Sequence, residues 1–135
     1  MSKRLVTAAV VLGLLGGVAM SALGSWCLVY SDSDCLNWQG DYWYYRLEMH
    51  SGDSYKFALS GIPFYADFDM KFWFNSNRDS TLSSSELEWT QNSGGNGDDE
   101  VHTYTATFSG LYILKVYSYS GTGCYSLRVY RLGNC

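Results

Sequence analysis

Carboxylate side chains form three clusters along this chain, and oxygen-rich clusters are the chemistry that Ca²⁺ prefers. The clusters are Asp32 with Asp34, Asp67 with Asp69, and Asp98-Asp99-Glu100. Calcium takes six to eight oxygen ligands, so loops that brought clusters together would form a site. The candidate ligands are Asp67, Asp69, Asp98 and Asp99. We favour the simpler interpretation of solvated turn and edge charges, because no contiguous EF-hand loop is present, and no other cofactor is indicated.

Enzymatic chemistry has weak support in the sequence. Asp67 and Asp69 lie on one face of a predicted strand, about 7 Å apart, a separation that would suit glycoside hydrolysis. A sheet face supplies no cleft, however, and neighbouring Lys71 offers simple charge balance. His50 and His102 are the only histidines and neither lies near a nucleophile-elbow serine. We therefore predict no catalytic residues, and rank a small secreted enzyme last among the functions considered.

The four cysteines predict two disulfides. Cys27, Cys35, Cys124 and Cys135 all follow a predicted export signal, and no CxxC or Cys/His cluster suggests zinc. A strand over residues 124–132 would hold Cys124 and Cys135 too far apart to bond, which disfavours the pairing of neighbours in sequence. Of the two remaining pairings, our hypothesis is Cys27 with Cys135 and Cys35 with Cys124, which would lay the N-terminal segment along the last strand.

Aromatic residues are in excess, with 12 Tyr, 5 Trp and 6 Phe. About half have the parity of core positions. The outward remainder is Tyr42, Tyr44, Trp73, Tyr117, Tyr119 and Tyr130. If their strands share a sheet, these rings would form a binding platform, since Tyr and Trp give large contact area with a polar edge. The alternative is that tyrosine simply suits exposed strand positions.

Alternating hydrophobicity predicts the strands that would position these groups. Their ranges are 41–50, 55–60, 67–74, 86–91, 100–108, 111–119 and 124–132. The core-facing residues are predicted as Trp43, Tyr45, Leu47, Met49, Tyr55, Phe57, Leu59, Phe68, Met70, Phe72, Phe74, Leu87, Trp89, His102, Tyr104, Ala106, Tyr112, Leu114, Val116, Tyr125, Leu127 and Val129. The turn at 51–53 predicts a hairpin between the first two strands, and Gly turns join the last three into one antiparallel sheet.

No segment carries a sustained helical period, so the fold class is all-β. About seven to eight strands at short spacing favour a two-sheet antiparallel β-sandwich, jelly-roll-like in character. Residues 1–24 have a basic start, an apolar run and a small-residue end, which predicts a signal peptide; an uncleaved N-terminal anchor is the alternative. Residues 25–135 would then be one domain, located outside the cell or in the periplasm.

The charge balance excludes some partners. The whole chain has a net charge of −4, and without Lys3 and Arg4 of the predicted signal the charge becomes −6. No basic patch is apparent, so nucleic acid is excluded, as are membrane surfaces once the signal is cleaved.

Three motifs resemble the bacterial pre-peptidase C-terminal domain, which is related to collagenase collagen-binding domains. They are residues 40–47 followed by the 51–53 turn, residues 67–70, and residues 109–117 leading into 123–129. The resemblance covers roughly residues 40–132 and implies a jelly-roll-like sandwich appended to secreted peptidases, with calcium bound in some relatives. Here Trp43 stands where the first motif commonly has a second acidic residue.

Together these features predict a secreted, non-catalytic module that binds extracellular polysaccharide or protein through an outward aromatic face. The alternative is a structural protein that self-assembles, or coats a surface, through strand edges or the same aromatic face. Oligomerisation is therefore an open expectation.

Overall fold

The structure is a computed structural model of the chain, and it describes residues 4–7, 24–79 and 81–135. Its strands are β1 (Arg4–Thr7), β2 (Ser25–Leu36), β3 (Tyr42–Met49), β4 (Ser54–Ser60), β5 (Asp67–Phe74), β6 (Leu87–Gln91), β7 (Glu100–Thr105), β8 (Gly110–Ser120) and β9 (Gly123–Gly133). A 3₁₀ turn, η1 (Ser84–Glu86), precedes β6. None of the described segments is a helix long and apolar enough to cross a membrane.

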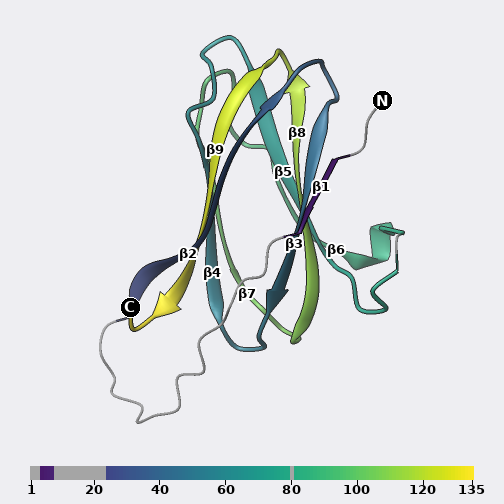
Figure 1. Cartoon of the computed structure of the whole chain (residues 1–135), viewed down its shortest axis with the longest axis vertical. Coiled ribbons are helices and arrows are strands. Elements are labelled where there is room, and N and C mark those ends of the chain that lie inside the picture. The colour runs from purple at the N-terminus through teal and green to yellow at the C-terminus, as the bar shows by residue number, and fades with distance from the viewer. Residues whose placement is uncertain (1–3, 8–23, 80) are drawn as a thin grey trace.

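Two sheets pack face to face (Figure 1). Sheet A has the order β1-β3-β8-β5-β6, and sheet B has the order β2-β9-β4-β7. From β2 to β9 every pairing is antiparallel, and the chain passes repeatedly from one sheet to the other. This arrangement of eight strands is that of a jelly roll. The predicted all-β sandwich is confirmed.

Two predictions about which strands are neighbours are wrong. β3 and β4 do not form a hairpin, because the turn at residues 51–53 carries the chain from sheet A to sheet B. The last three strands likewise do not form one sheet: β7 and β9 lie in sheet B, with β4 between them, and β8 lies in sheet A. Alternation identifies which face of a strand is buried but leaves open which strands are neighbours.

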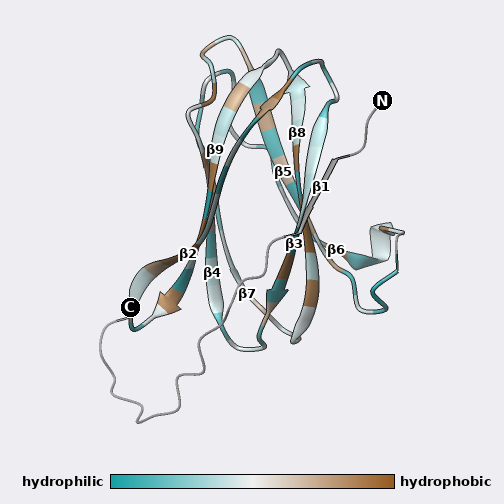
Figure 2. Cartoon of the chain, viewed as in Figure 1, coloured by the Kyte–Doolittle hydropathy of each residue, from teal (hydrophilic) through white to brown (hydrophobic). Residues whose placement is uncertain are grey.

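The core between the sheets consists largely of the residues that alternation selects. Tyr45, Tyr55, Phe68 and Leu127 are fully buried, and bands of apolar and polar residues alternate along several strands (Figure 2). At its centre, Phe72 stacks on both Trp89 and Tyr112 with ring centroids 5.1 Å apart. Leu87 is a correction: it is exposed, because β5 and β6 shift register where Leu87 pairs with Trp73.

The N-terminal segment lies along the last strand, as the cysteine hypothesis requires. β2 pairs with β9 in antiparallel register, with Cys35 directly opposite Cys124. The structure contains both predicted disulfides, Cys27–Cys135 and Cys35–Cys124. The termini of the domain are thereby fastened to the same edge of sheet B.

β1 lies within the segment predicted to be a signal peptide, most of which is outside the described residues. Its four residues pair in parallel with Trp43–Arg46 of β3. Signal cleavage stays a prediction; it would remove β1 and make β3 the edge strand of sheet A.

Candidate ligand-binding face

Five residues from β3, β5 and β8 form a patch on the outer face of sheet A. Tyr42 pairs with Tyr117 and Tyr44 with Lys115 across β3 and β8, while Lys71 of β5 pairs with Lys115 from the other side. Directly opposed residues point to the same side of a sheet, so the five side chains are neighbours. All five are half-buried. We call this patch the aromatic–lysine face.

Lys115 occupies the centre of the aromatic–lysine face. Its Nζ lies 4.8 Å from the ring centroid of Tyr42, 5.8 Å from that of Tyr44 and 5.4 Å from that of Tyr117. Lys71 Nζ lies 5.5 Å from the Tyr117 centroid, and the rings of Tyr42 and Tyr44 are 5.0 Å apart. Burial, and then the charge of Lys71, lower the pKa of Lys115. The rings therefore hold two ammonium groups close together through cation–π contacts.

The other predicted platform residues are not all at this patch. Trp73 lies on the same outer face, where it pairs with Ile113, and Tyr119 lies further along β8 with 64% of its surface exposed. Tyr130 belongs to sheet B, on the opposite side of the sandwich, where Lys56 Nζ lies 4.7 Å from its ring. The six aromatics therefore do not form one platform, because β9 does not share a sheet with β3, β5 and β8.

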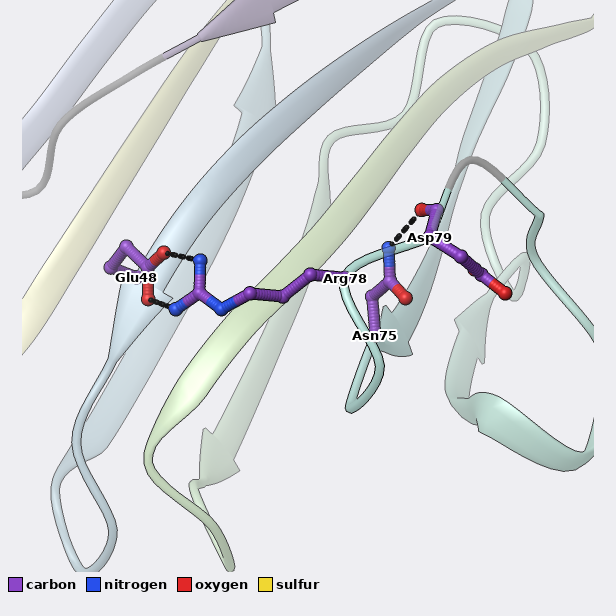
Figure 3. Close-up of polar contacts among 4 residues, drawn as sticks. All are labelled: Glu48, Asn75, Arg78 and Asp79. Carbon is purple, nitrogen blue, oxygen red and sulfur yellow. Dashed lines mark hydrogen bonds and ion pairs between the residues drawn. The ribbon is translucent and has the colours of Figure 1, made fainter.

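The outer face of sheet A also has an apolar part, at the end of the sheet away from Tyr42 and Tyr117, and this part is covered. Leu111 and Ile113 of β8 are only 3% and 6% exposed, although they point away from the core. Arg78, in the segment after β5, reaches across to β3 and donates two hydrogen bonds to Glu48, at 2.7 and 3.0 Å (Figure 3). Glu48 is the cross-strand partner of Leu111. The aromatic–lysine face, whose five residues are half-buried, is therefore the more exposed half.

Three carboxylates gather beside the aromatic–lysine face. Asp67, Asp69 and Glu100 offer oxygens that all lie within 4.8 Å of one another. Asp69 is only 3% exposed, and its Oδ1 and that of Asp67 are buried without a hydrogen-bond partner among the described residues. Burial, followed by the charges of Asp67 and Glu100, raises the pKa of Asp69 to about 7.

Tyr117 connects the acidic group with the aromatic–lysine face. Its ring contacts the two lysines, while its hydroxyl interacts with the Asp69 carboxylate. Burial, and then the charge of Asp69, raise the pKa of Tyr117 to about 12, so the phenol stays protonated and can donate to Asp69. No ion pair within the described chain joins Lys71 to Asp67 or Asp69.

The acidic group differs from the predicted calcium ligands. Asp98 and Asp99 are not members: both are exposed in the turn before β7, and Asp98 Oδ2 accepts a hydrogen bond from the Gly95 amide. Glu100 takes their place, and its carboxylate also accepts hydrogen bonds from the Gly94 amide and the Gln91 side chain. The signal that could have found it is parity, because Glu100 has the same parity as His102, Tyr104 and Ala106, the residues of its strand that are predicted to face the core.

The histidines have structural surroundings. His102 stacks on Trp89 with ring centroids 4.1 Å apart, and its Nδ1 lies 3.1 Å from Gln91 Oε1. Burial lowers the pKa of His102, which favours the neutral ring. His50 is exposed at the end of β3. Neither residue is paired with a serine hydroxyl in the described part of the chain.

No protein-family description and no curated protein sequence matches this chain. Several solved structures, however, resemble it in fold. The pre-peptidase C-terminal domain of a Bacillus anthracis collagenase superposes with a TM-score of 0.54, 18% identity, and coverage of 96% of this chain and 97% of that one. This chain has the fold of a pre-peptidase C-terminal domain. The resemblance predicted from the three motifs is confirmed at the level of the fold.

Two other proteins share the pre-peptidase C-terminal fold with this chain. Aeromonas hydrophila PliG, described as a periplasmic inhibitor of g-type lysozyme, has a TM-score of 0.56 at 15% identity, covering 96% of this chain and 99% of PliG. CorA of Methylomicrobium album, described as a surface-associated copper-binding protein, has a TM-score of 0.57 at 7% identity, covering 76% and 93%. One fold therefore carries different binding functions, and function must be argued from this chain's own side chains.

Proposed function

We propose that this protein is a non-catalytic extracellular binding module whose ligand-binding surface is the aromatic–lysine face. The observation that carries the proposal is the contiguity of Tyr42, Tyr44 and Tyr117 around Lys115 on the outer, partly exposed face of sheet A. Half-buried rings fixed by neighbouring strands lose little entropy when they are covered, and Tyr is enriched where proteins bind ligands. The ligand class expected from the sequence is an extracellular polysaccharide or protein.

Two further observations support a role outside the cytoplasm. All four cysteines are paired in disulfides, which persist in oxidising compartments. The fold is shared with proteins described as a periplasmic inhibitor, a domain of a collagenase and a surface-associated protein. These likenesses support a binding role in general and identify no ligand for this chain.

Replacing both Tyr42 and Tyr117 with alanine should reduce retention on the cognate matrix about tenfold or more, because two ring contacts are lost. The measurement is a pull-down of the oxidised protein on insoluble polysaccharides and fibrous proteins, collagen included. The matched control is Tyr130→Ala, which removes a lysine-contacting tyrosine from the opposite face and should leave retention unchanged. Equal loss in both variants would contradict the proposal.

The alternative function, self-assembly, can be distinguished from ligand binding by studying the same protein without ligand. Size-exclusion chromatography over a hundredfold range of concentration should give one elution volume for a binding module. A concentration-dependent shift that Tyr42→Ala/Tyr117→Ala abolishes would assign the face to self-association instead.

We propose, secondly, that the group of Asp67, Asp69 and Glu100 binds Ca²⁺. The specific support is that Oδ1 of Asp67 and Oδ1 of Asp69 are buried with no hydrogen-bond partner among the described residues. A hard cation would satisfy these two atoms, and carboxylate oxygen is the ligand calcium prefers. The remaining ligands would have to be water or a bound anion. Binding would favour ionised Asp69, and its test is combined below with that of the Asp69 pKa.

A further inference from the structure

Lys71 and Lys115 are an unusual pair for a sheet surface. They are direct cross-strand partners on β5 and β8, and like charges in that position destabilise a sheet. Their contacts are with tyrosine rings, and no Asp or Glu oxygen of the described chain forms an ion pair with either Nζ. The chain as a whole is acidic, with a net charge of −4. Two cations are therefore concentrated, partly desolvated, on the aromatic–lysine face.

The geometry points to a negatively charged group as the missing partner. We propose that the aromatic–lysine face binds a carboxylate-bearing polysaccharide, with a uronate carboxylate between Lys71 and Lys115 and the sugar rings against Tyr42, Tyr44 and Tyr117. This inference rests on the proposed function, because it specifies the ligand of the same face. Each ammonium supplies three donors, and hydrogen bonds between oppositely charged groups are the strong ones.

The strand arrangement favours a polysaccharide over an acidic polypeptide. Polypeptides bind sheets most readily by adding a strand to an edge, where backbone groups are unpaired. Lys115 and Tyr117 lie on β8, whose two sides are paired with β3 and β5. At its centre, around Lys115 and Tyr117, the patch therefore offers only side chains, namely flat rings and ammonium groups. A sugar with an apolar ring face and a carboxylate at its rim matches both the tyrosine rings and the lysine ammonium groups.

The test measures the affinity of the oxidised protein for polygalacturonate by affinity electrophoresis and calorimetry. Fully methyl-esterified polygalacturonate carries the same backbone without charge, dextran sulfate carries sulfate, and polyglutamate carries carboxylates on a polypeptide. We expect binding to polygalacturonate that weakens with salt, and weaker or no binding to the ester and to polyglutamate. Lys115→Gln should weaken polygalacturonate binding about tenfold, the loss expected for one charge-assisted hydrogen bond.

The control is Lys56→Gln. Lys56 also lies over aromatic rings, those of Trp26 and Tyr130, but on sheet B. Lys56→Gln and Lys115→Gln change the net charge by the same amount, so a nonspecific electrostatic effect would appear equally in both variants. Thermal midpoints report whether each variant is folded.

The outcomes separate this inference from the proposed function. One outcome is equal affinity for polygalacturonate and its methyl ester, with affinity lost in Tyr42→Ala/Tyr117→Ala but not in Lys115→Gln. This result would overturn the role of the carboxylate but would still support the aromatic–lysine face as the binding surface. Tighter binding of dextran sulfate or of polyglutamate, sensitive to Lys115→Gln, would overturn the uronate in favour of a sulfated polymer or an acidic polypeptide. No binding of any polymer by the folded protein would overturn the inference, and the matrix pull-down would then decide the proposed function.

Discussion

Replacing Asp69 with asparagine should stabilise the folded protein at pH 8 by about 2 kcal/mol and remove part of its pH dependence. Asp69 is buried beside Asp67 and Glu100, and its pKa is raised from 3.8 to about 7. Ionising it at pH 8 places a third charge against two carboxylates. Asparagine has nearly the same shape, carries no charge, and can donate to the neighbouring carboxylates.

The direction in which stability changes with pH depends on whether the folded or the unfolded protein keeps the proton on Asp69. Between about pH 4 and pH 7 the folded protein keeps a proton on Asp69 that the unfolded chain has lost. This group's contribution to stability is therefore fully present below pH 4 and is lost as the pH rises through about 7. The loss approaches about 1.4 kcal/mol for each pH unit in that window.

The measurement is urea unfolding of wild type and Asp69→Asn at pH 4.5, 6 and 8 with chelator present. The difference between the two should favour the variant increasingly as the pH rises. Asp99→Asn, the same chemical change at an exposed position of a nearby turn, controls for the altered net charge. A difference independent of pH would contradict the raised pKa.

Calcium gives the same variants a second readout. If Asp67, Asp69 and Glu100 bind Ca²⁺, millimolar calcium should stabilise wild type at pH 8 and leave Asp69→Asn unchanged, because binding to the native state alone shifts the unfolding equilibrium. Equal responses of the two proteins would contradict a metal site here while leaving the pKa argument intact.

The sequence predicts the core better than the topology. Tyr45, Phe57 and Leu114 are assigned correctly because a strand has a period of two, and that period is visible in one chain. The turn at 51–53 is also found, but a tight turn can join strands of one sheet or of two. That choice depends on packing between distant segments, which no local pattern records.

The candidate face is partly predictable for the same reason. Tyr42, Tyr44 and Tyr117 have outward parity and are found together, whereas Tyr130 has the same parity and lies on the far side. Lys115 was not selected because a lone outward lysine is unremarkable until its cross-strand partners are known. Glu100 is not among the predicted ligands, because an acid at the start of a predicted strand, directly after two turn aspartates, resembles a solvated turn charge.

Removing both disulfides should cost about 8 kcal/mol of unfolding free energy, which is comparable with the whole stability of a typical domain. The bonds Cys27–Cys135 and Cys35–Cys124 span 108 and 89 residues, and closing loops of that size restricts the unfolded chain strongly. We therefore expect the fully reduced protein, or the variant with all four cysteines replaced by alanine, to be largely unfolded at 37 °C.

Removing only one disulfide should cost less than half of that loss. The two bonds are nested, so either one alone already closes the long loop, and the second adds a loop of roughly 20 residues, worth about 3 kcal/mol. Urea unfolding of Cys27→Ala/Cys135→Ala, of Cys35→Ala/Cys124→Ala and of the combined variant measures this coupling. A combined loss equal to the sum of the two single losses would show that the bonds act through separate native contacts. A larger combined loss would show that they act by holding the two ends of the unfolded chain together.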